Sequence, residues 1–166
     1  MKKLYQFYVG GNAGHSNIEV HDIQFVVCED YEEAIPILKS RWFGDADKIH
    51  IDGWQVINWV DGYDVSVTDK PSECEERLFF VNVGGYEKGN LAELHEFGLF
   101  VAKTPEEAKA KGLQSLLIGF EQQHKDNLKD VDDVIEISEL DGEYIHLHKN
   151  TDGSTEPIGF QGYMPI

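Results

Sequence analysis

Residues 4–34 read LYQFYVGGNAGHSNIEVHDIQFVVCEDYEEA, and residues 78–108 repeat this stretch as LFFVNVGGYEKGNLAELHEFGLFVAKTPEEA. The two stretches align without a gap at an offset of 74 residues, and 10 of 31 positions are identical. Ordinary residue usage would give about two identities by chance. The match resumes at an offset of 80 residues, where Ile51-Asp52 aligns with Val131-Asp132 and Asp61-Gly62 with Asp141-Gly142. The chain is therefore an internal duplication.

Each copy has the pattern of two strands, a helix and two further strands. Runs rich in aromatic and β-branched residues predict the strands. Capping boxes at residues 30–33 and 104–107 predict the two helix starts, and an Asp-Gly dipeptide predicts a hairpin between the last two strands of each copy. The expected strands are residues 3–9, 19–28, 53–60 and 63–67 in the first copy and 77–83, 93–102, 133–140 and 143–148 in the second.

The duplication predicts the fold class. One unit of four strands and a helix is too small to bury a good core, so we expect both copies to pack as one globular unit around a pseudo-twofold axis. The predicted fold is α+β, with two tandem ββαββ repeats, a largely antiparallel sheet and helices on one face. The first repeat covers residues 1–70, the second covers 71–150, and an irregular tail covers 151–166. The pattern leaves open whether the strands form one sheet, two sheets or a barrel.

The composition excludes several classes of partner. The chain of 166 residues has 14 Lys and Arg against 31 Asp and Glu, a formal net charge of −17. Without clustered cations, binding to nucleic acid or to an anionic membrane is disfavoured. No signal peptide or membrane span is visible, and Cys28 and Cys74 are too few for a disulfide framework. We expect a cytoplasmic protein whose charge serves solubility, a basic partner or bound cations.

The only histidines that recur in register are His21 and His95, and each follows a glutamate by two residues, Glu19 and Glu93. Side chains at positions i and i+2 of a strand share a face. Two imidazoles and two carboxylates that converge near the pseudo-twofold axis would suit Zn²⁺ or Mn²⁺, or acid–base work. The alternative is that each histidine merely bonds a neighbouring group and closes a strand end, which the sequence favours because buried polar groups are normally satisfied.

Two further features are weaker. His146 and His148 alternate on an expected strand, and an H-x-H pair can chelate a metal, but strand alternation favours their exposure to solvent. The glycine-rich segments after the first strand of each copy are expected to be mobile hairpin loops that can line a pocket. Candidate residues at the rim of such a pocket are Asn12, Asn17 and Asn90.

Several short motifs are distributed over nearly the whole chain. They are Gly10-Gly11-Asn12-Ala13-Gly14, Glu19-Val20-His21-Asp22, Trp42-Phe43-Gly44-Asp45, Ile51-Asp52-Gly53, Leu94-His95-Glu96-Phe97-Gly98-Leu99-Phe100-Val101, Gln123-His124-Lys125-Asp126-Asn127 and Val131-Asp132-Asp133. On these motifs the chain resembles a bacterial family known as domain of unknown function 1543. The resemblance implies a bacterial, stand-alone cytosolic protein, but it brings no activity and no catalytic residue.

Three functional hypotheses follow from the sequence. The first is a small acidic binding or interaction protein, with a homodimer or a basic protein as partner, because no catalytic signature is present and the net charge is strongly negative. The second is a metal-binding protein or small enzyme that uses the repeated Glu-x-His pairs. The third is a small-ligand binder whose pocket lies under the glycine-rich loops.

Overall fold

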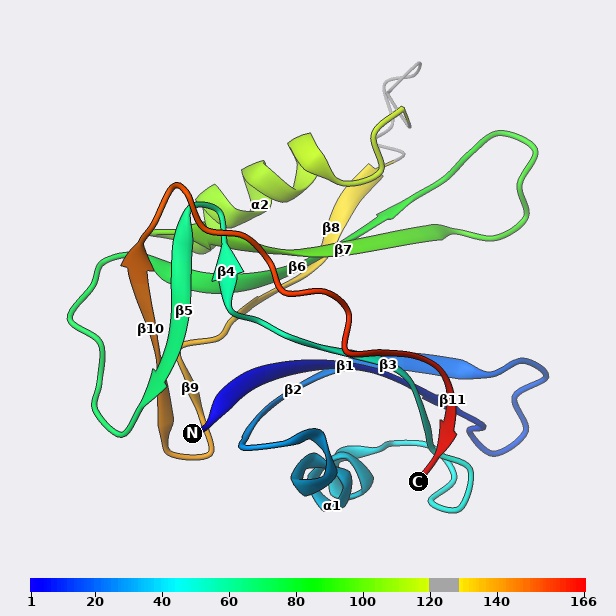
Figure 1. Ribbon diagram of the computed structural model, residues 1–166. Coiled ribbons are helices and arrows are strands. Elements are labelled where there is room, and N and C mark those ends of the chain that lie inside the picture. The colour runs from blue at the N-terminus through cyan, green and yellow to red at the C-terminus, as the bar shows by residue number, and fades with distance from the viewer. Residues whose placement is uncertain (120–128) are drawn as a thin grey trace. The chain divides into compact units, whose positions relative to one another are not determined.

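The computed structural model describes residues 1–119 and 129–166, and these residues form two compact units. Unit 1 comprises Met1–Pro71 and Glu139–Ile166, and unit 2 comprises Ser72–Ser138. In chain order the elements are β1 (Lys3–Gly11), β2 (Val20–Cys28), α1 (Tyr31–Arg41), β3 (His50–Val56), β4 (Trp59–Val60), β5 (Tyr63–Thr68), β6 (Arg77–Gly85), β7 (Leu94–Ala102), α2 (Pro105–Ser115), β8 (Lys129–Glu136), β9 (Glu139–Leu140), β10 (Glu143–Lys149) and β11 (Phe160–Pro165) (Figure 1).

The first sheet of unit 1 has the strand order β11-β3-β1-β2, and all its neighbouring strands are antiparallel. Helix α1 lies against one face of this sheet (Figure 1). Alternate residues of the strands, such as Phe7, Val26 and Ile51, point to that face and pack with Ala34 and Leu38 of the helix. The opposite face of β1, β2 and β3 therefore carries the other alternate residues, which include the histidines of the candidate site.

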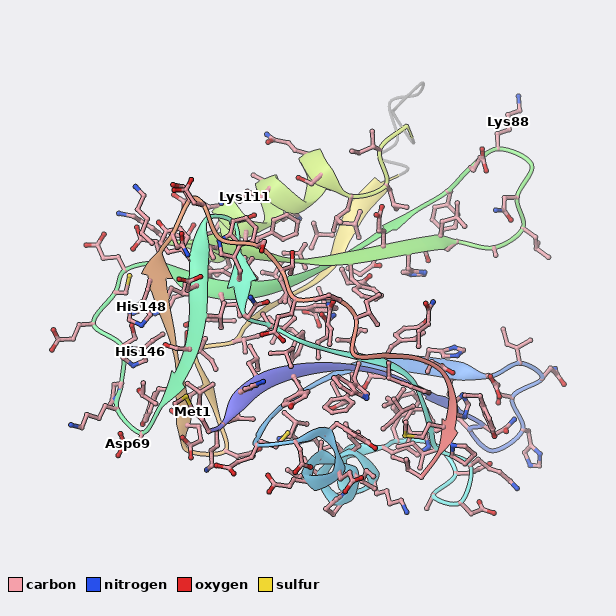
Figure 2. The ribbon with its side chains drawn as sticks, in the orientation of Figure 1. Met1, Asp69, Lys88, Lys111, His146 and His148 are labelled. Atoms are coloured by element: carbon pink, nitrogen blue, oxygen red, sulfur yellow. The ribbon has the colours of Figure 1, made fainter. Side chains whose placement is uncertain are left out.

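The second sheet of unit 1 has the order β4-β5-β10-β9, so the last hairpins of the two repeats pair with each other. Ser66 of β5 lies opposite His146 of β10. These two residues are counterparts at the repeat offset of 80, so a local twofold axis passes between them. His146 and His148 both project from β10 (Figure 2).

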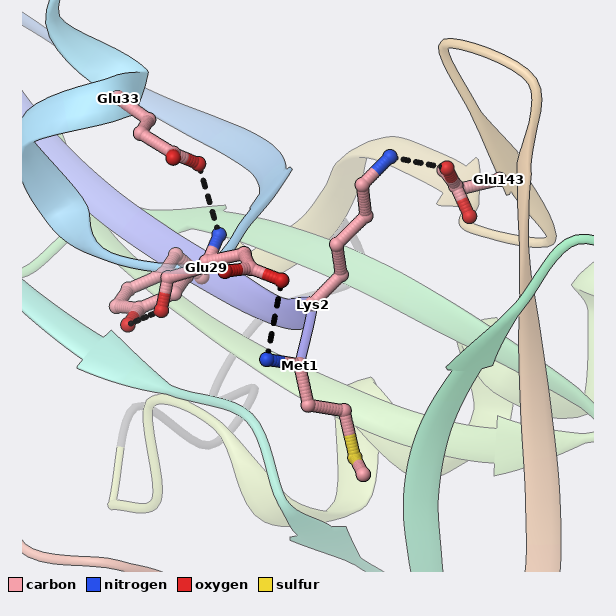
Figure 3. A network of polar contacts seen from close by, with 6 residues as sticks. Met1, Lys2, Glu29, Glu33 and Glu143 are labelled. Carbon is pink, nitrogen blue, oxygen red and sulfur yellow. Dashed lines mark hydrogen bonds and ion pairs between the residues drawn. The ribbon is translucent and has the colours of Figure 1, made fainter.

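Polar contacts connect the two sheets within unit 1. Figure 3 shows the ion pair of Lys2 with Glu143 of β10. Beside it, the terminal amino group of Met1 lies 3.1 Å from a carboxylate oxygen of Glu29. Arg41 donates one hydrogen bond of 2.8 Å to Asp141 in the β9–β10 turn. The contacts of Lys2 and Arg41 therefore connect the β9–β10 hairpin to the first sheet and its helix, whereas the Met1 contact stays beside the first sheet.

Unit 2 also consists of an antiparallel sheet with a helix on one face, but its sheet has three strands instead of four. Its sheet has the order β7-β6-β8, and helix α2 packs on one face. The helix approaches the sheet at Gly112, where a methyl group would lie 2.6 Å from a side-chain carbon of Val81. The absence of a side chain at this position therefore sets how closely α2 lies on β6.

The predicted capping boxes are confirmed at both helices. The carboxylate of Asp30 accepts hydrogen bonds from the backbone N–H groups of Glu32 and Glu33, and the hydroxyl of Thr104 accepts one from Glu107. Each cap satisfies backbone donors that have no partner inside the helix. The predicted α+β fold with two ββαββ-like repeats is confirmed as well.

Some sequence expectations were wrong in detail. The pairs Gly10-Gly11 and Gly84-Gly85 continue β1 and β6 instead of forming turns, because two partner strands bond their backbone. The third strands begin earlier than expected, at His50 and Lys129. Part of the supposedly irregular tail forms β11, which adds to the edge of β3.

The repeat boundary expected at residue 70 comes from the sequence alignment. The compact units are divided differently, because the last hairpin of the second repeat belongs to unit 1, where it pairs with β5. The packing of both repeats as one globular unit, and the tail as a separate segment, stay predictions. Neither α1 nor α2, the helices of the described residues, has the length and apolarity needed to cross a membrane.

Candidate metal centre

Gly10 of β1 lies at the centre of the candidate site. In the sheet register it pairs with His21 of β2 on one side and with His50 of β3 on the other. All three residues lie in one row across the sheet, on the face opposite α1. The two imidazoles therefore flank a position that has no side chain.

A register shift in β3 brings a carboxylate to the same place. Tyr8 pairs with Gly53 and Val9 pairs with Ile51, so Asp52 between them has no partner on β1. An extra residue of this kind is a β-bulge, which bends the strand and redirects a side chain. Glu19, immediately before β2, supplies a second carboxylate two residues from His21.

The four side chains form a compact group, which we call the first centre (Glu19, His21, His50 and Asp52). The carboxylate of Asp52 faces both rings: its Oδ2 lies 3.2 Å from Nε2 of His21 and its Oδ1 lies 3.3 Å from Nε2 of His50. Oε2 of Glu19 is 3.9 Å from the first of these nitrogens and 3.8 Å from the second. Glu19, His21 and His50 each offer one ligand atom, and these atoms lie within 4.8 Å of one another, while Asp52 contacts both rings through its two oxygens.

The side chains of the first centre range from fully buried to half exposed. The side chain of His50 is 2% exposed, whereas that of Glu19 is 51% exposed. Nδ1 of His50 lies 3.4 Å from the carbonyl oxygen of Lys48, a contact that favours the Nδ1–H tautomer and leaves the Nε2 lone pair available. Oδ2 of Asp52 is buried and has no hydrogen bond, and its contact of 3.2 Å with Nε2 of His21 is an ion pair only when that ring is protonated. A buried carboxylate oxygen without a hydrogen bond is costly, so a cation at this point would stabilise it.

Two tyrosines border the first centre. Tyr8 stacks on the ring of His21 with 5.1 Å between centroids and 6° between planes, and Tyr163 of β11 lies 4.6 Å from the ring of His50. Burial and the neighbouring carboxylate of Asp52 raise the pKa of Tyr8 above its usual value. Its hydroxyl therefore stays neutral at ordinary pH and adds no further negative charge.

The distances suit a metal ion with mixed nitrogen and oxygen ligands. A tetrahedral Zn²⁺ with bonds of about 2.0–2.2 Å holds its ligand atoms roughly 3.3–3.6 Å apart. The nitrogen–oxygen distances of the first centre, 3.2 to 3.9 Å, bracket that range. Imidazole nitrogens favour transition metals over Mg²⁺ or Ca²⁺, and the carboxylates supply the compensating negative charge.

Unit 2 has a related group, which we call the second cluster (Glu93, His95 and Asp132). Nε2 of His95 lies 3.3 Å from Oδ2 of Asp132 and 3.7 Å from Oε2 of Glu93. Gly84 takes the place of Gly10, because it pairs with His95 on one side and with Asp130 on the other. The sequence therefore has an aspartate at the strand position that His50 occupies in the first repeat.

Comparison with known proteins gives a family but no activity. Residues 16–67 and 90–140 match the family described as Domain of Unknown Function (DUF1543), one segment in each repeat. The chain belongs to the DUF1543 family. A crystal structure of a protein Il1583 from Idiomarina loihiensis is similar to it, with 30% sequence identity, a TM-score of 0.77 and coverage of 99% of this chain and 97% of the other. No curated protein matches.

The structure of this DUF1543 protein places each predicted site residue. Glu19 and His21 meet in the first centre, and Glu93 and His95 meet in the second cluster. The convergence of both pairs on a single shared site stays a prediction, since the pairs lie in different units. Each pair instead has partners on the third strand of its own repeat.

Sequence reasoning missed those third-strand residues, His50, Asp52 and Asp132. A signal was present, because Ile51-Asp52 and Val131-Asp132 are part of the repeat alignment. The β-bulge that turns both aspartates toward the histidines could not be read from a pattern of alternation. His50 has no histidine counterpart in the second repeat, so a search for recurring histidines passes over it.

The remaining candidates have simpler surroundings. Asn12, Asn17 and Asn90 are exposed, and their role at a pocket rim stays a prediction. Nε2 of His146 lies 2.7 Å from a backbone oxygen of Lys70 and that of His148 lies 3.1 Å from the hydroxyl of Ser66, so both rings have ordinary polar partners. The family motif at residues 123–127 lies outside the described residues.

Proposed function

We propose that this DUF1543 protein binds one divalent transition-metal ion at the first centre. The observation that supports the proposal is the convergence of Nε2 of His21 and Nε2 of His50 on the two oxygens of Asp52, with Glu19 closing the group. An ordinary surface ion pair needs neither a 98% buried imidazole nor a buried carboxylate oxygen that lacks a hydrogen bond. A metal ion would satisfy both groups at once.

The ligand set favours Zn²⁺ among the common metals. Two imidazoles and two carboxylates complete a tetrahedral shell, which Zn²⁺ adopts without electronic preference. Mn²⁺ also accepts such ligands but prefers more oxygen. Because Glu19 is half exposed and lies outside β2, it is the ligand that an incoming molecule would displace most easily. The exposure of Glu19 therefore supports an exchangeable coordination position on the solvent side of the proposed site.

Zinc binding to the full-length protein tests the proposal. Removing a ligand should weaken Zn²⁺ binding by much more than tenfold. Even the loss of a residue that only hydrogen-bonds to a metal ligand typically lowers metal affinity by roughly 10- to 100-fold. Isothermal titration with Zn²⁺ in the presence of a competing chelator is expected to give a tight site in the wild-type protein that His21→Ala removes. Because His21 is one-third exposed, this variant should fold.

The matched control is His148→Ala. His148 belongs to an H-x-H pair on β10 whose rings lie 6.3 Å apart, so it is also the rival zinc ligand. The control is expected to bind Zn²⁺ as the wild type does. If His148→Ala loses the tight site and His21→Ala keeps it, the metal ion belongs to β10 and the proposal is wrong.

We also propose a bacterial, cytoplasmic setting, supported by the family resemblance and by the free thiols of Cys28 and Cys74. Interaction with a basic partner, which the net charge of −17 favours, stays a prediction. It is compatible with metal binding, because a cation at the first centre removes little of that charge.

A further inference from the structure

The second cluster differs from the first centre in its chemistry. It has one imidazole and two carboxylates, whereas the first centre has two imidazoles with Glu19 and the adjacent Asp52. The third-strand position that pairs with Gly84 is Asp130, so the second repeat has no counterpart of His50 there. The ligand set of the second repeat is therefore richer in oxygen.

The backbone holds this group as it holds the first. Asn82 pairs with Asp133 and Val83 pairs with Val131, so Asp132 is the unpaired residue of a bulge at the same place as the one that carries Asp52. A methyl group at Gly84 would lie 2.6 Å from Oδ2 of Asp132 and 2.7 Å from Oε1 of Glu93. The two carboxylates thus lean together over a glycine.

Neighbouring side chains orient both carboxylates. The amide of Asn82 donates a hydrogen bond of 3.4 Å to Oδ2 of Asp132. A hydrogen bond between Tyr86 and Glu93 raises the pKa of that tyrosine, because the carboxylate favours the neutral phenol. In the described part of the chain, neither carboxylate forms an ion pair with a lysine or arginine. Among the described residues, His95 is therefore the basic side chain that both carboxylates contact.

We propose that Glu93, His95 and Asp132 form a second divalent cation site, with Mn²⁺ as an ion that suits its ligand set. Oxygen-rich sites with a single imidazole suit Mn²⁺, which takes six ligands and keeps water in the remaining positions. The site is also more exposed than the first centre, with His95 48% and Asp132 39% exposed. Its affinity is therefore lower than that of the first centre, and its metal exchanges faster.

This inference goes beyond the proposed function, because it concerns different residues in the other unit. The test is electron paramagnetic resonance of free Mn²⁺ during titration of the full-length protein, with native mass spectrometry to count bound ions. The wild type is expected to bind two Mn²⁺ ions of unequal affinity. Asp132→Asn keeps the shape of the side chain but removes a ligand charge, and it should weaken the second ion by at least about tenfold.

The matched control is Asp133→Asn, which removes the same charge from the neighbouring exposed residue. It is expected to leave both ions bound. Equal loss in both variants would mean that the acidic surface attracts Mn²⁺ without a site, and no loss in Asp132→Asn would mean that the second cluster binds nothing. Either result overturns the inference.

Asp52→Asn separates this inference from the proposed function. It should remove the tighter ion and leave the weaker one. If Asp52→Asn has no effect while Asp132→Asn does, the second site stands and the first centre fails. The reverse pattern supports the first centre alone. Circular dichroism and thermal melting of each variant establish that it is folded before its binding is interpreted.

Discussion

Adding one methyl group at Gly10 should abolish metal binding without removing any ligand. A Cβ at this position would lie 2.7 Å from Cδ2 and 2.9 Å from Nε2 of His21, and 2.8 Å from Nε2 of His50. Ordinary contacts begin at about 3.4 Å, close to the separation at which carbon atoms attract each other best. Both imidazoles would therefore have to retreat by roughly 0.6 Å, whereas a metal site tolerates about 0.2 Å.

The expected loss follows from that displacement. Two of four ligand atoms would leave their positions, so we expect the Zn²⁺ affinity of Gly10→Ala to fall by at least about 100-fold, or roughly 2.8 kcal/mol. The fold should survive, because overpacking of this kind costs about 1–3 kcal/mol and the ring of His21 can swing toward solvent. Gly10 also lies in a regular strand, where alanine is acceptable.

The assay is chelator competition for Zn²⁺, with thermal melting in the presence and absence of the metal. Gly84→Ala is the matched control, since it adds the same methyl group at the equivalent position of unit 2. Its Cβ would disturb Asp132 and Glu93 but none of the first centre. A folded Gly10→Ala protein that binds Zn²⁺ within about twofold of the wild type would refute the assignment of the first centre.

Two further predictions concern stability. Burial raises the pKa of the Cys28 thiol from 9.0 to about 11, so the thiol of the unfolded chain loses its proton at a lower pH than that of the folded chain. The stability contributed by the neutral thiol therefore falls as the pH rises from about 9 to about 11. Urea unfolding at pH 8 and pH 10.5 should show a larger loss of unfolding free energy in the wild type than in Cys28→Ala, and equal losses would contradict this. Asp30→Ala removes the acceptor for two backbone N–H groups of α1 and should lower the free energy of unfolding by about 1 kcal/mol. The control is Asp47→Ala, which removes an exposed carboxylate in a loop and should change the free energy of unfolding little.

The parts of the fold that were predictable from the sequence are those set by local chemistry. The capping side chains of Asp30 and Thr104 satisfy helix donors wherever a helix begins, so both helix starts were found. Alternation placed β1, β2, β6 and β7 within two residues of their bounds. Each of these signals depends only on neighbours in the chain.

The features that were missed depend on distant pairing. β11 reads as an irregular tail because glycine, proline and polar residues surround it, and it becomes a strand only by bonding to the edge of β3. The pairing of β5 with β10 likewise joins the ends of the two repeats, which no local pattern reports. The shared face of Glu19 and His21 was predictable, whereas their approach to His50 and Asp52 required the sheet order β3-β1-β2.

The two repeats share the backbone arrangement around the two proposed metal sites but differ in the side chains that line them. Both keep a glycine on the central strand, a bulged aspartate on the third strand and a Glu-x-His pair on the second. They differ at the third-strand position beside the glycine, which is His50 in one and Asp130 in the other. The glycine is constrained by sterics, since a Cβ there would lie within 3.0 Å of side chains of the proposed site. The second repeat keeps the glycine, the bulged aspartate and the Glu-x-His pair but lacks the second imidazole. We therefore expect its proposed site to bind a divalent cation more weakly than the first centre does.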